Sequence, residues 1–430
     1  MANQNNNLKE EIKILGKSVH ISVDMPKIIS KIKTMHIFNK KKRKQKREEL
    51  YEHLKYKTGT HKKEIDFIEK QVKKHKYVYA IVGLGWNCPL HQRPHQRAKC
   101  IAKEKGIFLY AEREKNANPF LRQEGNIIFF NKEYLFHFSP KVSKKIYLIV
   151  PNVEYFFTLQ VCKKLRERGI NLIYDYIDDF SDLITHNNKT QLELFKNLEQ
   201  SDFCLFCATA KSLYNQLVPR FGKDKVILNP NGVNLNDFKA SEPKILYPDM
   251  KDIIERSKNA PIVGYYGALA EWIDWEMLNE VHKKRKQYSF VYIGYRYDKS
   301  IEKLKPADNV FILREKPYSE LCKYVDFFNC TIIPFKNGDI AKATNPIKLF
   351  EYMSMKKPVV CTKDLIECYG YDGVLIADGS DDFAAKLDEA IMLDKDENIK
   401  NKLYSTALEN TWTKRVLDLD KKIQEIRKSI

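Results

Sequence analysis

Long apolar runs are missing from this 430-residue chain. No stretch approaches the roughly 18–20 uncharged apolar residues that a membrane-spanning helix requires. The amino terminus, Met-Ala-Asn-Gln-Asn-Asn-Asn, also lacks the apolar core of a secretory signal. The sequence therefore predicts neither a membrane span nor a signal peptide, and we expect a cytoplasmic protein.

Cysteines arranged as a disulfide framework or a metal site are missing as well. The nine cysteines are an odd number and are scattered along the chain, which argues against a disulfide framework. Cys204 and Cys207 have CxxC spacing, but they lie in an apolar run without a second pair, so buried strand residues are the favoured interpretation. His91 and His95 are four residues apart, yet Pro94 keeps them off one helix and no third ligand is evident. Ordinary loop histidines are favoured there, and no metal is predicted.

Acidic residues are scarce in the amino-terminal segment. Residues 1–77 contain 21 Lys and Arg against 9 Asp and Glu, and so carry +12 of the net charge of +19. The block Lys40–Arg47 is a solvated helix or arm in the simplest interpretation. Attraction to an anionic membrane is the functional alternative, since clustered basic residues contribute about 1 kcal/mol each near such a surface. No base-reading motif accompanies the block, so we favour the membrane surface and predict no nucleic-acid partner.

Short apolar runs alternate with amphipathic segments from Tyr77 onward, a pattern typical of parallel α/β sheets. The expected strands are 77–82, 107–111, 146–150, 172–176 and 203–208 in a first series, and 262–266, 290–293, 310–313, 329–333, 358–361 and 374–377 in a second. The expected helices are 94–105, 153–167, 180–199 and 210–221, followed by 275–285, 318–324, 346–355, 381–393 and 412–427.

The two series predict two doubly wound, Rossmann-like α/β domains with a cleft between them. We place a basic arm, helical or partly disordered, at 1–75, the first domain at 76–240 and the second at 241–407. A final helix at 408–430 is expected to pack back on the first domain, and a linker is expected around 239–260, where prolines interrupt the periodicity. Ligands of such sheets bind at the carboxyl ends of the strands.

The most informative segment is Thr344-Asn-Pro-Ile-Lys-Leu-Phe-Glu-Tyr-Met353. Pro346 suits the first turn of a helix, where free backbone amides can hold an anion such as a pyrophosphate. Lys348 and Glu351 are three apart and share one face, so a cation for phosphate and a carboxylate for ribose hydroxyls would suit a nucleoside diphosphate. Spacing alone favours the simpler alternative, a surface ion pair.

This segment resembles the donor-binding stretch of retaining GT-B glycosyltransferases of the glycogen-synthase-like superfamily. The resemblance implies that Glu351 binds the ribose of a nucleotide sugar, and that Lys348 and the amides around Asn345 and Pro346 face its phosphates or sugar. It also places Gly267, at the end of the first strand of the second domain, at the donor. The matching positions are Pro346, Lys348, Glu351, Tyr352, Met353, Lys357, Pro358, Val359 and Val360.

Further motifs match over roughly 77–425. Asn229-Pro-Asn-Gly-Val233 resembles the turn after the last strand of the first domain in the superfamily. Val263–Asp274, and Trp86 followed by Gln92-Arg-Pro-His-Gln96, are similar to the teichuronic-acid-type glycosyltransferases.

Two positions depart from the superfamily's pattern. Ala343 stands where many relatives carry a glutamate that touches the transferred sugar. No cation follows Gly267, where relatives place Arg and Lys on the pyrophosphate. Lys348, Lys342, a helix amino terminus or Arg93 must then supply the positive charge.

The first domain offers three candidates for the site. Gly83-Leu-Gly85 is a weak fragment of a dinucleotide fingerprint, and under the resemblance Gly85 lets the backbone approach the donor phosphate or the acceptor. Arg93 presents a fork that suits an anionic group, and we predict a catalytic role for it. Asp178 lies in an acidic cluster after a strand and is predicted to be the catalytic residue on the acceptor side, whereas Asp179 or Ser181 is assigned to helix capping.

The resemblance implies a retaining, metal-independent hexosyltransferase without a cofactor, using a UDP- or GDP-sugar as co-substrate. The acceptor would be a glycan or a lipid-linked molecule in cell-wall, capsule or surface-polysaccharide synthesis. Trp272 and Trp275 could line a sugar or base site, although core packing is the default for both. A degenerate, non-catalytic partner subunit and a nucleotide-sugar epimerase remain the alternatives.

Overall fold

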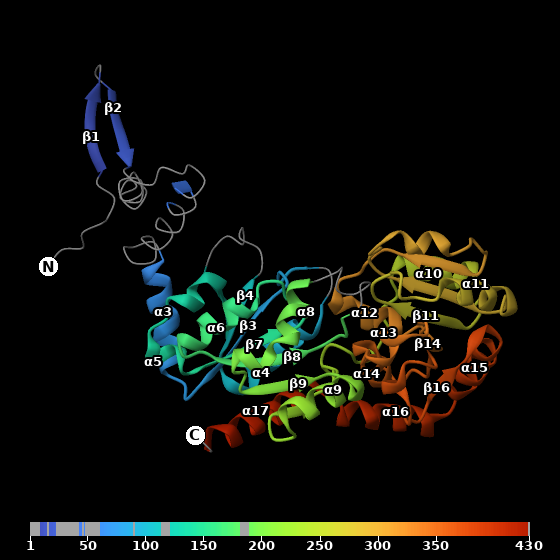
Figure 1. Cartoon of the computed structure of the whole chain (residues 1–430). Coiled ribbons are helices and arrows are strands. Elements are labelled where there is room, and N and C mark those ends of the chain that lie inside the picture. Colours follow the sequence, from blue (N-terminus) through green and yellow to red (C-terminus); the bar gives the residue numbers. More distant parts are fainter. Residues whose placement is uncertain are drawn as a thin grey trace. The chain divides into compact units, whose positions relative to one another are not determined.

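The computed structural model describes residues 9–14, 17–22, 43–44, 47, 61–88, 91–112, 121–180 and 189–428 (Figure 1). Two compact units result: Met1–Tyr77 together with Glu133–Lys145, and Val78–Lys132 together with Ile146–Ile430. No helix in the described ranges is long and apolar enough to cross a membrane.

The first unit contains an antiparallel hairpin and a helix. Strand β1 (Lys9–Ile14) pairs with β2 (Lys17–Ser22), and Lys9 lies opposite Ser22. The expectation of a helical arm is wrong for this stretch, because Val19 and Ile21 alternate with polar residues as in a strand. Helix α3 (Lys62–Lys73) buries Ile65, Ile68 and Val72 and packs against the short helix α5 (Pro140–Ser143). The basic block Lys40–Arg47 lies mostly outside the described residues.

The second unit contains two sheets, and the first of them has eight strands. Their order is β10-β9-β8-β7-β3-β4-β6-β5, and all pairs except β5–β6 are parallel. The strands are β3 (Val78–Gly83), β4 (Phe108–Glu112), β5 (Arg122–Glu124), β6 (Ile127–Asn131), β7 (Ile146–Pro151), β8 (Asn171–Tyr176), β9 (Leu205–Ala208) and β10 (Val226–Leu228). The central strands are buried throughout, which explains their uninterrupted apolar sequences.

The helices associated with this sheet are α4 (Arg93–Lys105), α6 (Leu159–Glu167), α8 (Lys189–Lys196) and α9 (Lys211–Phe221). The last helix of the chain, α17 (Trp412–Lys428), packs against α4. Asp420 of α17 accepts a hydrogen bond from the Tyr79 hydroxyl at 3.0 Å and forms a 2.9 Å ion pair with Lys105. The carboxyl terminus therefore returns to the first sheet.

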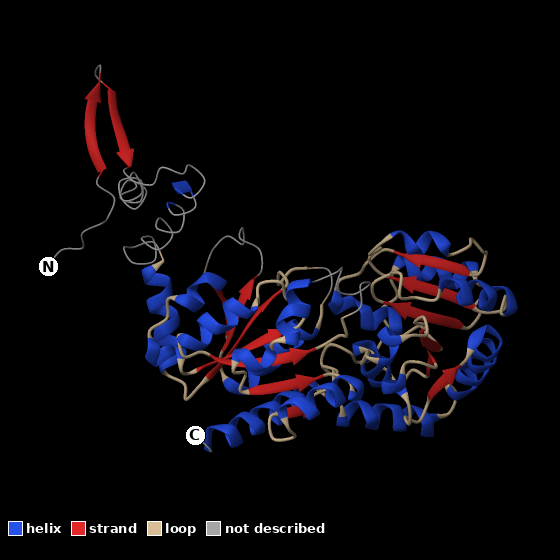
Figure 2. Ribbon diagram, viewed as in Figure 1, coloured by secondary structure: helices blue, strands red, loops and turns tan. Residues whose placement is uncertain are grey.

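The second sheet has six parallel strands in the order β13-β12-β11-β14-β15-β16. The strands are β11 (Ile262–Tyr266), β12 (Ser289–Ile293), β13 (Val310–Leu313), β14 (Cys330–Ile333), β15 (Val359–Thr362) and β16 (Val374–Ala377). The helices of this half are α10 (Pro248–Arg256), α11 (Trp275–Lys284), α12 (Tyr318–Val325), α13 (Asp339–Lys342), α14 (Ile347–Ser354), α15 (Gly379–Leu393) and α16 (Glu397–Glu409). Figure 2 shows the strands of each sheet side by side with helices packed around them.

The direction in which successive strands are added reverses once within each sheet. The reversal lies between β3 and β7 in the first sheet and between β11 and β14 in the second. In open parallel sheets, ligands bind outside the carboxyl ends of the strands at such switch points. The predicted fold class, two doubly wound α/β sheets, is confirmed.

Several elements of the second unit were not predicted, among them the short elements β5, β10 and α13. Helix α10 lies inside the predicted linker, because Pro248 begins a helix there instead of interrupting one. Strand β6 (Ile127–Asn131) extends the first sheet by a strand that was not predicted. Helix α16 was missed because it buries only Leu403 and Ala407, which leaves little apolar periodicity to recognise.

Candidate functional site

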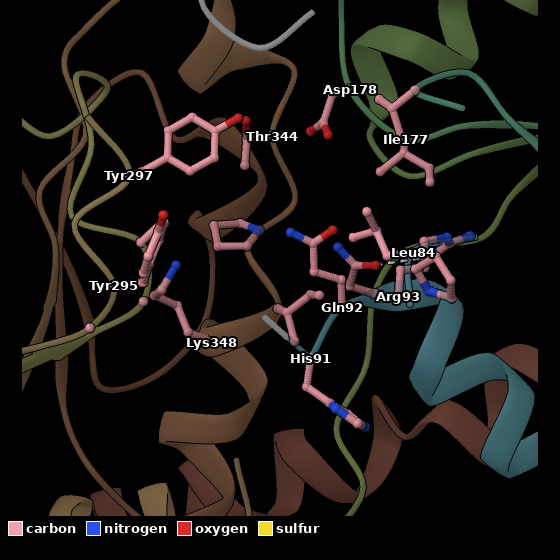
Figure 3. A pocket seen from close by; sticks show the side chains of 18 of the residues that line it. Leu84, His91, Gln92, Arg93, Ile177, Asp178, Tyr295, Tyr297, Thr344 and Lys348 are labelled. Atoms are coloured by element: carbon pink, nitrogen blue, oxygen red, sulfur yellow. Dashed lines mark hydrogen bonds between the residues drawn. The ribbon is translucent and has the colours of Figure 1, made fainter. Parts of the chain in front are cut away.

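A cavity of about 610 Å³ lies at the switch points of both sheets in the second unit. One wall comes from the ends of β3, β7 and β8, through Leu84, Glu154 and Asp178. The other comes from the ends of β11 and β12 and from the amino terminus of α14. Figure 3 shows Tyr295, Tyr297 and Lys348 on one side of the cavity and Leu84, Ile177 and Asp178 on the other. Its volume suits a small organic ligand.

Lys348 is the cation that α14 brings to this cavity. Pro346 precedes the first turn of the helix, whose amides have no acceptors within the helix, and both residues line the cavity. The Lys348 ammonium lies 5.3 Å from the Tyr265 ring centroid and 5.4 Å from that of Phe335. Within the described part of the chain, the Lys348 ammonium donates no hydrogen bond to a protein acceptor. Burial lowers the pKa of Lys348 to about 8. A helix amino terminus and a desolvated ammonium together make an anion site.

Gly267 and Gly294 let two strand ends approach each other beside Lys348. Gly267 has φ +141°, and a methyl group there would lie 3.2 Å from Lys348 Cε. A methyl group on Gly294 would lie 1.8 Å from the Gly267 carbonyl oxygen. The backbone can therefore pass under the lysine only if both positions are glycine.

We expect Gly294→Ala to lower the free energy of unfolding by about 1–3 kcal/mol, because the added methyl group displaces the Gly267 segment. Thermal unfolding measures this effect. Gly85→Ala is the matched control, since a methyl group there meets nothing within 4 Å. Equal stability of the two variants would contradict the close approach.

Glu351 is buried and held by two tyrosines. Its Oε2 accepts a short hydrogen bond from the Tyr266 hydroxyl, and its Oε1 accepts one from Tyr318 at 2.6 Å. Burial raises the pKa of Glu351. It forms no ion pair with Lys348 in the described structure, so the surface ion pair that spacing favoured is not what the helix builds. Glu351 also lines the cavity, which leaves it able to meet a ligand's hydroxyl groups.

His91 joins this group from the first half of the unit. Its ring stacks on Tyr318, with centroids 4.8 Å apart and planes at 21°. Burial, together with the neighbouring Lys99 and His95, lowers the pKa of His91 to about 3, so the ring is neutral at physiological pH. The sequence analysis interpreted His91 as an ordinary loop histidine. The residues around it gave no indication that its ring would stack on Tyr318, which lies far away in the sequence.

Asp178 stands on the opposite wall, in the segment that follows β8. Its backbone carbonyl accepts a hydrogen bond from the Asn152 side chain at 2.7 Å, which fixes the segment. No described donor binds its carboxylate, and burial raises the pKa of Asp178 to about 6. The neighbouring Asp179 accepts from the Phe180 amide at 2.7 Å, whereas Ser181 lies outside the described residues.

Arg93 does not present its fork to a ligand, and the predicted catalytic role needs correction. Its side chain is only 2% exposed. The guanidinium donates to both oxygens of Asp175, each at 3.0 Å, and also to Asn229 and Asn231. Although burial opposes ionisation, Arg93 and Arg97 hold the pKa of Asp175 below its usual range. The donors of Arg93 are consumed in this buried network, so we assign it a structural role.

Asn345 connects that network to the beginning of α14. Its Oδ1 accepts a hydrogen bond from the Asn231 backbone amide at 2.9 Å, and its carbonyl accepts one from the Asn231 side chain at 2.6 Å. Asn231 in turn accepts from Arg93 at 3.1 Å. Asn345 lines the cavity, but its side chain is used to hold the loop before Lys348.

Gly85 lies outside the cavity lining. Its carbonyl faces the His95 ring, 3.3 Å from Nε2, and Gly83 and Leu84 take the place that was predicted for it. Trp272 lines the cavity, whereas Trp275 is a core residue whose indole donates to Ser300 at 3.2 Å. The sequence interpretation missed the cavity tyrosines as ligand groups, because nothing in their local pattern separates them from core aromatics.

The described residues contain no cluster of three or more His, Cys, Asp or Glu able to hold a metal ion. Cys204 and Cys207 lie in and beside β9, and burial raises the pKa of each thiol to about 12. Cys207 is a buried residue of β9, as the sequence indicated, whereas Cys204 directly precedes the strand and is only partly buried.

Comparison with known proteins finds a similarity that includes the Lys348 wall. Residues 260–392 match the family model of glycosyl transferases group 1. The match covers less than a third of the chain and includes β11 to β16 and α14. A Bacillus subtilis protein named TuaH, whose name assigns it to teichuronic acid biosynthesis as a glycosyltransferase, is 26% identical over 199 residues. That match covers 44% of this chain and 49% of TuaH, so the chain spans about half the length of this relative.

Several solved structures share the fold of this chain over most of its length. The α,α-trehalose 6-phosphate synthase of Burkholderia multivorans has a TM-score of 0.60 at 12% identity, covering 82% of this chain and 99% of that chain. HepE of Anabaena, solved in complex with UDP, has a TM-score of 0.59 at 14% identity, covering 81% of this chain and 100% of the HepE chain. At these identities the likeness shows the GT-B fold.

Proposed function

We propose that the protein transfers a sugar from a nucleotide sugar, a UDP- or GDP-sugar, to a hydroxyl group of an acceptor. The observation that carries the proposal is the cavity itself, where the Lys348 ammonium and the α14 amino terminus face an unbonded carboxylate, Asp178, on the opposite wall. One wall suits a diphosphate leaving group and the other suits a hydroxyl group. HepE and an E. coli trehalose-6-phosphate protein were solved with UDP or UDP-2-fluoroglucose, which supports a uridine nucleotide as first candidate.

The residues would divide the work as follows. Lys348 and the α14 amides hold the diphosphate and stabilise the negative charge that develops as the sugar–oxygen bond breaks. Glu351 accepts from the ribose hydroxyls. Asp178 accepts a hydrogen bond from the attacking hydroxyl, whose oxygen bonds to the anomeric carbon. The products are the glycoside, a nucleoside diphosphate and a proton. We propose retention of configuration and no metal requirement, as the resemblance to the retaining superfamily implies. Retaining transfer without a protein nucleophile depends on positioning and on stabilisation of the leaving group, which Lys348 and the α14 amides would supply.

The setting is also a proposal. We assign the acceptor to residues 76–240, the donor to 241–407, and the segment 408–430 to stabilising the first of these. The similarity to TuaH supports an acceptor in cell-wall or other surface-polysaccharide synthesis, either a glycan or a lipid-linked molecule. The basic segment 1–75 would hold the enzyme at the cytoplasmic face of an anionic membrane.

A thermal-shift panel of nucleoside diphosphates and nucleotide sugars tests the donor assignment. A ligand present at 100 times its dissociation constant should stabilise the fold by about 2.7 kcal/mol. We expect one base to give this shift, and we expect the shift to be absent in Glu351→Ala. The absence of any shift in a folded sample would overturn the proposal.

A catalytically degenerate partner subunit is the second candidate. Ala343 is buried where relatives carry a carboxylate, and Lys348 is the principal cation near the expected phosphates. Nucleotide binding without turnover in the presence of acceptor extracts would favour this candidate over the transferase.

The rate of UDP release from a bound donor, with water as acceptor, should rise with pH and level off above about 6. Asp178 is protonated below its pKa of about 6, and only the carboxylate accepts the hydroxyl hydrogen. Asp178→Asn should lower the rate by about 10²–10³-fold and abolish the rise. Asp179→Asn, which retains an acceptor for the Phe180 amide, should keep the plateau rate and the rise, with the rise moved to lower pH because the Asp179 charge helps to raise the pKa of Asp178. An unchanged profile in Asp178→Asn would remove Asp178 from the reaction.

A further inference from the structure

Three aromatic side chains stand on the α14 side of the cavity, and the roles proposed above use none of them. They are Trp272, Tyr295 and Tyr297, which we call the aromatic platform. Tyr295 is 44% exposed and Tyr297 is 38% exposed, so both rings are accessible to a ligand. Trp272 packs beside Tyr297, with ring centroids 5.4 Å apart.

The backbone fixes the platform in place. Tyr295 and Tyr297 are two apart in an extended segment after β12, so their side chains share one face. The Leu269 amide donates to the Tyr295 carbonyl at 2.9 Å, and the Tyr297 amide donates to the Leu269 carbonyl at 3.0 Å. On the other side, the Trp272 carbonyl accepts from the Lys336 amide at 2.7 Å. A surface held in this way loses little entropy when a ligand binds to it.

The wall that faces the platform is polar. Burial raises the pKa of Tyr297, and the nearby Tyr155 hydroxyl, from the first half of the unit, raises it further. Figure 3 shows the Tyr297 hydroxyl end directed across the cavity, toward the side where Asp178 lies. A ligand between these walls would meet ring faces on one side and hydrogen-bond acceptors on the other.

A pyranose ring has this pair of surfaces. Its axial C–H bonds form an apolar face that stacks on an aromatic ring, whose negative face attracts the C–H dipoles, while its hydroxyl groups project from the edge. A nucleobase would also stack, but its edge offers few hydroxyl-type donors to a carboxylate. We propose that the aromatic platform is a carbohydrate subsite that stacks a pyranose ring and turns its hydroxyl groups toward Asp178. The inference rests on the proposed transfer function and deepens it.

Two sources could supply the ring: the sugar of the nucleotide donor or the terminal sugar of the acceptor. Calorimetric titrations with UDP and with UDP-glucose identify the first. Saturation-transfer NMR with methyl glucosides, recorded on the UDP-saturated protein, identifies the second. Tyr295→Ala and Trp272→Leu are the test variants, and Tyr295→Phe is the matched control because it retains the ring face.

For a donor sugar, we expect Tyr295→Ala to weaken UDP-glucose binding by about fivefold or more and to leave UDP binding within twofold. For an acceptor sugar, UDP-glucose binding stays constant and the saturation transfer to the glucoside disappears. Tyr295→Phe should resemble the wild type in both cases. Equal weakening of UDP and UDP-glucose would overturn the proposal in favour of base stacking, and unchanged results in both assays would overturn it outright. If no nucleotide binds to the wild type, the proposed function fails, and glucoside binding without UDP still tests the platform.

Discussion

Lys348→Met should weaken the binding of a nucleoside diphosphate by about 10- to 100-fold. A hydrogen bond between charged groups contributes about 1.5–3 kcal/mol, and each 1.4 kcal/mol is a factor of ten. The loss should be large because few cations reach this part of the cavity: Arg93 is consumed by Asp175, and Lys316 pairs with Asp249 at 2.6 Å. Isothermal titration with UDP measures the effect.

Lys342→Met is the control for this variant. This substitution removes the same charge from the same region. The Lys342 side chain is exposed, however, and its ammonium nitrogen lies 3.9 Å from an Asp339 carboxylate oxygen and 3.8 Å from one of Asp364. Wild-type affinity should also fall above pH 8, because the Lys348 ammonium, with its pKa of about 8, loses its proton there unless the diphosphate retains it. Equal affinity of Lys348→Met and the wild type would remove the lysine from the phosphate site.

Glu351→Leu should destabilise the fold and abolish nucleotide binding. The buried hydroxyls of Tyr266 and Tyr318 would lose their shared acceptor, at a cost of about 1–3 kcal/mol for each group left without a partner. A carboxylate that meets the ribose would be lost at the same time. Thermal unfolding and UDP titration record the two effects separately.

Glu351→Gln separates binding from folding. The amide is nearly isosteric and its oxygen still accepts from one tyrosine, so stability should fall less than in Glu351→Leu. Binding should still fall about tenfold or more, because a neutral amide accepts hydroxyl hydrogens more weakly than a carboxylate. A stable Glu351→Gln protein with wild-type affinity would show that Glu351 serves the tyrosines and not the ligand.

The fold was predictable because its signals are local. Parallel strands buried on both faces produce short apolar runs such as Tyr77–Val82 and Ile262–Tyr266, and the amphipathic segments between them mark the helices. Elements with weak apolar periodicity, such as α16, were not predicted because they lack this local signal. The helix start at Pro346 could be predicted from proline's fixed φ and missing amide.

The contacts that define the cavity were not predictable from spacing. Arg93 meets Asp175 from 82 residues away, and no local pattern distinguishes a guanidinium aimed at a ligand from one buried against a carboxylate. His91 and Tyr318 stack across two halves of the unit, and Tyr295 and Tyr297 owe their exposure to the path of a loop. Such pairings depend on how the two sheets are joined, and the hydrophobic periodicity of a single sequence does not reveal that.

A crystal structure of the chain with UDP tests the central claim most directly. We predict that the diphosphate binds at the amino terminus of α14 within hydrogen-bond distance of Lys348 Nζ, with the ribose hydroxyls on Glu351 and the aromatic platform left open for a sugar. A nucleotide bound away from α14, or one whose phosphates turn away from Lys348, would contradict the assignment of this cavity as the donor site.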